Sequence, residues 1–307
     1  MGRRVVASPR LVGILLILAT TATWGGAWVT ARAAAHDAPS LWMAVGRFAF
    51  AAAALLPIAA ILRRPVRFAH DRRTWLHLAG MALTGAIGYN LFFLWGVELA
   101  PASDGAVITP GLSGFFGALF VWGLDGIKPR AWAIRGGLLA LLGAAIIGYG
   151  AYDATAGTDR LIGNLLFVAA SVVWGVYTAI GRRLSGHVPA VEGVFWATAL
   201  AVLFWTPVAW AVTGPPQADW AAGAYWNMAY LGLFATAIGF VTWYMAVQRL
   251  GADRAGPGLG LVPFFGVLLA VVFLDEALLW THVLGGAVVV AGIYVSGRRD
   301  ARAPTAK

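Results

Sequence analysis

The stretch LVGILLILATTATWGGAWVTAR, residues 11–32, recurs as LIGNLLFVAASVVWGVYTAIGR, residues 161–182. At a constant offset of 150 the two segments share eight of 22 residues, where chance in such apolar sequence gives roughly two or three. The shared pairs are Leu11/Leu161, Gly13/Gly163, Leu15/Leu165, Leu16/Leu166, Ala19/Ala169, Trp24/Trp174, Gly25/Gly175 and Arg32/Arg182. Each segment is long and apolar enough to cross a bilayer, which takes about 20 residues. The repeat therefore predicts a duplicated membrane protein.

The composition supports a membrane protein. The chain of 307 residues is 60% hydrophobic and 11% charged, with a mean hydropathy of +0.77, whereas a soluble domain carries roughly 25% charged residues. Lipid must therefore solvate most of the surface. The chain has no cysteine, which excludes disulfides, cysteine-ligated zinc and thiol catalysis. No cofactor or metal site is predicted.

Ten apolar stretches are predicted to span the membrane. The first follows a basic start that resembles a cleavable signal, but its repeat lies deep inside the chain, so we expect it to be retained. The predicted spans are 11–31, 41–62, 74–97, 104–124, 131–150, 161–181, 190–213, 225–249, 255–274 and 280–297.

The basic residues predict the direction of these spans. If the N-terminus is cytoplasmic, nineteen of the 22 Lys and Arg residues lie in cytoplasmic segments and only Arg32 and Arg160 lie outside. Such a bias is typical of multi-pass membrane proteins. It predicts cytoplasmic termini in a bacterial inner (plasma) membrane. It also explains the net charge of +9 without a nucleic-acid partner.

An odd number of spans per copy predicts an inverted repeat. We expect an all-α integral membrane protein whose first five-helix repeat covers residues 1–156 and whose second covers residues 157–307, together one structural unit. Phe115-Phe116-Gly117 matches Phe264-Phe265-Gly266 at an offset of 149, and Gly136-Gly137 matches Gly285-Gly286. Transporters with inverted repeats bind their solute near the bilayer midplane, where the copies meet.

The second half carries the most specific family signature. Leu250-Gly251-Ala252, Pro263, Leu274-Asp275-Glu276, Gly285-Gly286 and Gly292 resemble the last three spans of EamA-type carriers of the drug/metabolite transporter superfamily. The resemblance covers nearly the whole chain and implies ten helices, alternating access and export of small metabolites. It is strongest to the branch that exports amino acids, aromatic ones included. Asp125-Gly126 departs from the acidic turn at Asp275-Glu276, and Arg47 matches Ala197.

Polar and aromatic residues in the middle of spans are the candidates for a solute path, because polar side chains there usually face protein or water. Aromatic faces suit stacking or cation–π contact, and an amide both donates and accepts hydrogen bonds. Packing between helices is the competing interpretation. The predicted substrate-binding residues are Trp24, Tyr89, Asn90, Phe93, Ser171, Trp174, Thr178, Phe240 and Trp243.

Three prolines within spans are predicted gating or hinge positions, because proline removes a backbone donor: Pro110, Pro257 and Pro263. Arg47 lies inside the second span, where a lone arginine costs about 2.5 to 3.5 kcal/mol on insertion scales. A structural pair with Glu98 or Asp104 is favoured over contact with a substrate carboxylate. These two acids are expected to be the only ones near span interiors that could carry coupling protons.

Other functions remain as alternatives. Gly111-Leu112-Ser113-Gly114 matches the motif of intramembrane serine proteases, but a serine nucleophile needs a nearby base and the histidines lie at span ends. The chain is therefore predicted not to be an enzyme. A pore, channel or facilitator for small solutes is the other alternative. Small residues at Ala144/Gly148 and Ala287/Ala291 fit either a homodimer or internal packing.

Overall fold

The computed structural model describes residues 9–64, 66–153, 157–184, 186–217, 219–250 and 255–298. Its elements in the first half are α1 (Pro9–Ala33), α2 (Ser40–Ile61), α3 (Arg72–Met81), η1 (Ala82–Gly88), α4 (Tyr89–Leu99), α5 (Ala102–Asp125) and α6 (Ala131–Asp153). Those in the second half are α7 (Gly157–Leu184), α8 (Ala190–Thr213), α9 (Ala222–Ala229), η2 (Tyr230–Ile238), α10 (Gly239–Leu250), η3 (Gly256–Gly260), α12 (Leu261–Leu274) and α13 (Trp280–Ser296).

These elements form ten crossings within the described residues. Eight helices are long and apolar enough to cross a membrane, and the shorter apolar helices Gly258–Leu274 and Trp280–Ser296 complete the set. The protein is therefore an all-α, multi-pass membrane protein, and the ten predicted spans are confirmed to within a few residues. The boundary between the predicted repeats falls at residues 154–156, which lie outside the described residues, and it stays a prediction.

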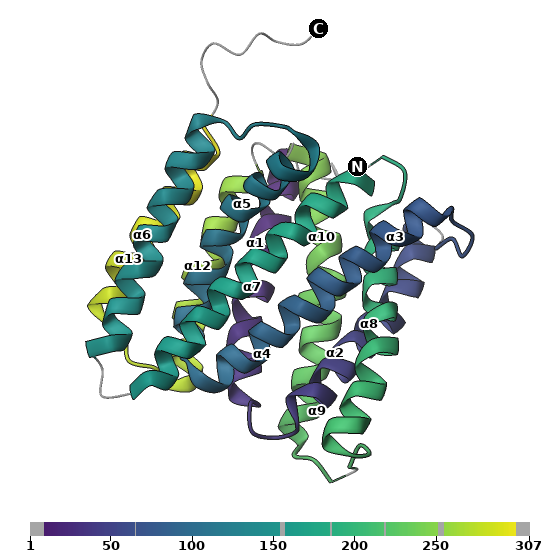
Figure 1. The fold of residues 1–307 in the computed structure, drawn as a ribbon, viewed down its shortest axis with the longest axis horizontal. Coiled ribbons are helices and arrows are strands. Elements are labelled where there is room, and N and C mark those ends of the chain that lie inside the picture. Colours follow the sequence, from purple (N-terminus) through teal and green to yellow (C-terminus); the bar gives the residue numbers. More distant parts are fainter. Residues whose placement is uncertain are drawn as a thin grey trace, which may run out of the picture.

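The helices of the two copies pack on one another in matching pairs (Figure 1). α1 contacts α12 and α10, while α7 makes the equivalent contacts with α5 and α4. α6 pairs with α13 at one edge of the bundle, and α2 pairs with α8 at the other. Interchanging the two copies converts the contacts of α1 into those of α7 and leaves the α6–α13 and α2–α8 pairs unchanged, as an inverted repeat requires.

Two glycines let the central helices approach closely. A Cβ added at Gly25 would lie 2.8 Å from the Gly266 nitrogen, and one added at Gly175 would lie 2.8 Å from the Gly117 nitrogen. Both Gly25 and Gly175 are therefore packed against the backbone of the partner helix. Gly25 and Gly175 belong to the repeated Trp-Gly match, and Gly266 and Gly117 belong to the repeated Phe-Phe-Gly match.

The α6–α13 pair is joined by a seam of glycines. Added Cβ atoms at Gly143 and Gly285 would lie 2.6 and 2.8 Å from each other's carbonyl oxygens, and Gly136 and Gly292 face each other in the same way. Small residues on these helices thus serve packing within the chain. Ala287 lies on the exposed side of α13, and the predicted homodimer remains untested.

Two crossings contain π-helical segments at equivalent places, η1 and η2. In η2 the Thr236 hydroxyl donates to the Leu231 carbonyl, five residues back, at 2.7 Å. Single π-helical turns often occur at functional sites.

Outside the spans, the Asp71 carboxylate accepts the Thr74 N–H at 2.9 Å, which caps α3. Hydrogen bonding with Thr74 lowers the pKa of Asp71.

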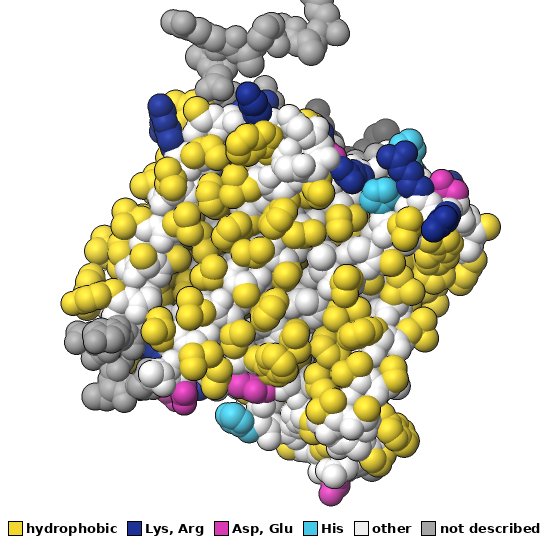
Figure 2. All heavy atoms as spheres, in the orientation of Figure 1, with side chains coloured by type: hydrophobic (Ala, Val, Ile, Leu, Met, Phe, Trp, Pro, Cys, Tyr) yellow, Lys and Arg dark blue, Asp and Glu magenta, His cyan; other side chains and the backbone are white. Residues whose placement is uncertain are grey.

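The surface separates into an apolar belt and two polar ends (Figure 2). Trp226 and Ile61 in the belt are 75% and 79% exposed, as expected of side chains that face lipid. On the face shown in Figure 2, most Lys and Arg side chains gather at the upper rim. We call this rim, with the α2–α3, α5–α6 and α7–α8 connections, the basic end, and the opposite rim the far end.

Candidate substrate cavity

A cavity of about 1060 Å³ lies in the centre of the bundle. Its walls come from both copies, and its mouth is formed by residues of the basic end such as Lys128, Arg130 and Val188. Among the described residues, none of the far-end connections at 34–39, 100–101 or 214–221 lines it. The cavity is therefore open towards the basic end and closed towards the far end.

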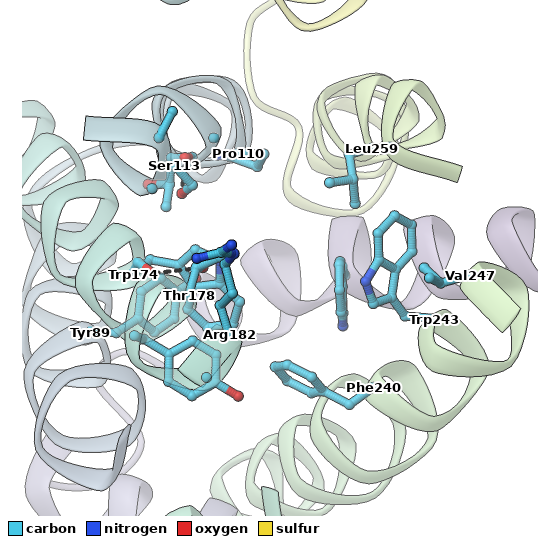
Figure 3. Close-up of a pocket in the computed structure, with 18 of the residues that line it drawn as sticks. Tyr89, Pro110, Ser113, Trp174, Thr178, Arg182, Phe240, Trp243, Val247 and Leu259 are labelled. Atoms are coloured by element: carbon cyan, nitrogen blue, oxygen red, sulfur yellow. Dashed lines mark hydrogen bonds between the residues drawn. The ribbon is translucent and has the colours of Figure 1, made fainter. Parts of the chain in front are cut away.

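Aromatic rings form a continuous chain across the cavity (Figure 3). The Trp24 ring centroid is 5.5 Å from that of Phe240, and the Trp174 ring is 4.9 Å from Tyr89. These two contacts are equivalent under the repeat. Trp174 also lies 5.8 Å from Phe240 and Trp24 lies 6.0 Å from Trp243, so the two copies meet through a wall of rings suited to an apolar solute.

Most of the predicted site residues come together here. The cavity is lined by Trp24, Tyr89, Phe93, Trp174, Thr178, Phe240 and Trp243 and by the predicted hinge Pro110. Asn90, Ser171 and Pro263 lie away from its wall. Ser171 instead donates to the Phe167 carbonyl at 2.8 Å, a packing contact. The side chain of Pro257 lies outside the described residues. Their roles in binding and gating stay predictions.

Arg47 does not pair with either predicted acid. Its Nη1 donates to Asn90 Oδ1 at 2.9 Å, and its Nε donates to Thr236 Oγ1 at 3.4 Å. Glu98 accepts a hydrogen bond from Ser40 at the start of α2. Arg47 is seven residues, or about 10 Å, deeper, which is why the pair does not form. The prediction of a structural ion pair was wrong.

The far end is closed by a buried ionic network. Arg160 donates to both oxygens of Asp104 at 2.8 and 2.9 Å, and His282 Nε2 lies 2.7 Å from the same carboxylate. Glu276 accepts hydrogen bonds from the backbone nitrogens of Ala102 and Ser103 at 2.7 and 3.1 Å. Asp104 is fully buried. The network therefore ties α5, α7 and α13 together beyond the cavity.

An aromatic plug lies between this network and the cavity. The Trp28 ring is 4.7 Å from Phe93 and 5.3 Å from Phe167, both edge to face, and all three side chains are buried. Trp28 and Phe93 also line the cavity. These three side chains close the cavity towards the far end, and we call them the aromatic floor.

One buried acid was missed by the sequence analysis. Glu192, in the first turn of α8, is fully buried, and its carboxylate lies 2.7 Å from His70 Nε2. Glu192 is the third residue of the predicted span 190–213, and this position could have identified it as a buried acid from the sequence. Glu98 and Asp104 are therefore not the only acids near span interiors, and a role of any of them in carrying coupling protons stays a prediction.

The geometry gives no support to a serine protease. The Ser113 hydroxyl donates to the Thr109 carbonyl at 2.6 Å. The described histidines that make contacts do so elsewhere: His70 with Glu192, His77 with Arg73 and His282 with Asp104. Ser103 lies 3.4 Å from His282 Nε2, but that same nitrogen faces Asp104, whereas a catalytic triad uses both ring nitrogens.

Comparisons with known proteins agree with this architecture. A model described as the EamA-like transporter family matches residues 11–149 and again residues 161–298. A probable terminal-alkyne amino-acid exporter of Streptantibioticus cattleyicolor is 30% identical over 92% of each chain. A probable amino-acid metabolite efflux pump of Escherichia coli is 22% identical over 92% of this chain and 94% of its own. A solved crystal structure has the same fold, with a TM-score of 0.66 and 21% identity, over 94% of this chain and 97% of that one.

Proposed function

The chain belongs to the EamA-like transporter family, and we propose that it exports amino acids, aromatic or apolar ones included, or related small metabolites. Transport would follow alternating access across a bacterial inner membrane, with the basic end cytoplasmic. Its relatives are named as a transporter, an exporter and an efflux pump, which supports membrane transport directly.

The observation that carries the proposal is the central cavity. It is about 1060 Å³ in volume, lies where the copies meet, and is lined by repeat-related aromatic rings. It is open at one end only, as expected of one state of an alternating-access carrier. The names of two relatives, an amino-acid exporter and an amino-acid metabolite efflux pump, support the substrate class.

A channel is the second candidate, and it would require the closed floor at Trp28, Phe93 and Phe167 to open while the basic end stays open. A channel needs a path open at both ends at once. Flux that rises linearly with solute concentration, without saturation, would favour the channel.

The test is counterflow in proteoliposomes with a panel of labelled amino acids. We expect saturable counterflow for apolar or aromatic members, and we expect Trp24→Ala and Trp243→Ala to impair it while membrane insertion is preserved. Trp226→Ala is the matched control, because that side chain is 75% exposed in the apolar belt. Absence of saturable counterflow for every amino acid would remove the substrate class.

The orientation is tested with single cysteines, which the cysteine-free chain makes simple. Cysteines replacing His36 and His187 lie in connections at opposite ends of the bundle. A membrane-impermeant maleimide added to whole cells should label the first and not the second. Labelling of both from one side would contradict the inverted repeat.

A further inference from the structure

Arg47 is a cation in the cavity wall that is held from two sides. Asn90 Oδ1 on α4 accepts from its Nη1, and Thr236 Oγ1 on η2 accepts from its Nε. Its Cζ atom also lies 5.5 Å from the ring centroids of Phe48 and Phe93. These neutral partners fix the position of the guanidinium without cancelling its charge.

The charge of Arg47 is not neutralised within the described part of the chain. No described carboxylate lies within ion-pair distance of Arg47, whereas Arg160, Arg182 and Arg183 each pair with an aspartate. Placing an unpaired arginine at such depth is costly, and such residues usually serve a function. A cavity-lining cation of this kind is a candidate to bind an anion that arrives with the solute.

Arg47 retains the donors that an anion needs. A guanidinium carries five N–H donors in a planar fork. The contacts to Asn90 and Thr236 use two of them, so three remain, and both hydrogens of Nη2 are among them. A carboxylate matches such a fork with two parallel hydrogen bonds.

The remaining charges of the cavity are also positive. Lys128, Arg130 and Arg182 lie at its mouth, and none of the described residues that line it is an aspartate or glutamate. A solute ammonium would therefore find aromatic faces and neutral hydroxyls such as those of Ser113 and Thr178, but no carboxylate among the described lining residues, and Arg47, Lys128 and Arg130 would repel it. The wall discriminates between the two charged groups of an amino acid.

We propose that Arg47 binds the carboxylate of the transported solute and that the cavity selects apolar carboxylates, with the amino group dispensable. Deaminated carboxylates of the same shape would then be ligands, and amines would not. The inference rests on the proposed function only in that the solute enters the same cavity. Since Arg47 matches Ala197 in the repeat, the cavity has one such anchor, and the solute binds with its carboxylate towards α2 and α4.

Matched triplets of ligands test the selectivity on the unaltered protein. Each triplet contains a carboxylate, the amino acid and the amine of one apolar body: 3-phenylpropionate, phenylalanine and phenethylamine, then indole-3-propionate, tryptophan and tryptamine, then 4-methylpentanoate, leucine and isoamylamine. Binding to the purified full-length protein is measured by calorimetry. We expect the carboxylate and the amino acid of at least one triplet to bind and its amine to bind at least tenfold more weakly. Equal binding of acid and amine, or binding by no carboxylate, overturns the proposal.

The variant Arg47→Gln tests the assignment to this residue. We expect it to weaken carboxylate binding roughly ten- to a hundredfold, to strengthen the weak amine binding because one repelling cation is removed, and to be partly rescued by Arg47→Lys. Arg135→Gln is the matched control, since it removes the same charge from an exposed residue of α6 that does not line the cavity. A folding defect would weaken all ligands together, so unchanged preference for the acid in a folded Arg47→Gln protein overturns the assignment.

The proposed function and this inference fail separately. Carboxylates that bind through Arg47 without counterflow of any amino acid would contradict amino-acid export and preserve the anchor. Saturable counterflow of an amino acid that amines inhibit as well as carboxylates do, and that Arg47→Gln leaves unchanged, would do the reverse.

Discussion

The two ends of the bundle differ, although the two copies that build them pack alike. At the far end, the Asp104–Arg160 pair is almost wholly buried and lies beyond the aromatic floor of the cavity. At the basic end, Asp125 pairs with Arg182 and Arg183, whose side chains are 50% and 35% exposed. The difference places the closed gate at the far end and the open mouth at the basic end.

This difference also shows what transport requires. The helix contacts are equivalent under the repeat, so the copies can exchange conformations. The ionic contacts of the described residues differ between the ends: the far end holds the buried Asp104 network, and the basic end holds the exposed pairs of Asp125 and the buried contact of Glu192 with His70. Opening the far end must therefore separate buried charges.

The largest effect is expected from Asp104→Asn. It leaves Arg160 buried without its charge partner, which costs about 3 to 5 kcal/mol, and we expect lower thermal stability together with opening of the far end. A cysteine replacing the cavity residue Thr109 reports the opening, because an impermeant maleimide should reach it from the far side only in the variant.

A double variant separates the gate from general damage. Asp104→Asn with Arg160→Met removes both charges, and replacing a buried ion pair by apolar groups is often close to neutral in stability. We expect the double variant to regain stability yet still label from the far side. A stable double variant that stays closed would show that the aromatic floor alone closes this end.

The next effect concerns the packing that both ends share. Gly25→Ala and Gly175→Ala each place a Cβ within 2.8 Å of a backbone nitrogen, and overpacking of this kind costs about 1 to 3 kcal/mol. We expect equal losses of thermal stability in the two variants. Gly286→Ala is the control, because nothing lies within 4 Å of the added Cβ. Clearly unequal losses of thermal stability would show that the two copies differ in helix packing and not only in the contacts at their ends.

The third prediction tests whether the buried contact between His70 and Glu192 stabilises the basic end. His70→Ala leaves the fully buried Glu192 without its neighbour, at a cost of about 1 to 2 kcal/mol. Thermal melting measures the loss, and Glu192→Gln in the same background should recover part of it. An unchanged melting temperature in His70→Ala would make the basic end wholly dependent on exposed contacts, which strengthens the contrast with the far end.

The sequence predicted the features that depend on span length and on repetition. Apolar length located the ten crossings, and the offset of 150 brought Trp24 and Trp174 to equivalent places on the cavity wall. Both signals are local or periodic, so neither needs knowledge of how the helices turn against one another. The lining aromatics were therefore predicted better than any polar contact.

The polar contacts depend on the relative depth and rotation of helices far apart in sequence. Arg47 meets residues 43 and 189 positions away, and Arg160 meets Asp104 across 56. Counting residues from span ends misplaced the Arg47 partners because α2 begins level with Glu98 and carries Arg47 deeper. The π-helical segment η2 places Thr236 beside Arg47. A residue count that assumes regular α-helices could not predict this contact.

The smallest effect is expected from Asp125→Asn, and it tests the contrast between the ends directly. The pairs of Asp125 with Arg182 and Arg183 join α5 to α7 just as Asp104 with Arg160 does, but water reaches them. Exposed pairs of this kind contribute little to stability, so we expect a small change in melting temperature that 0.5 M salt reduces further, since salt screens exposed charges. The same salt should leave the Asp104–Arg160 contribution nearly intact. If Asp125→Asn were as damaging as Asp104→Asn, burial would not be what distinguishes the two ends, and the closed gate would have to be sought in the aromatic floor.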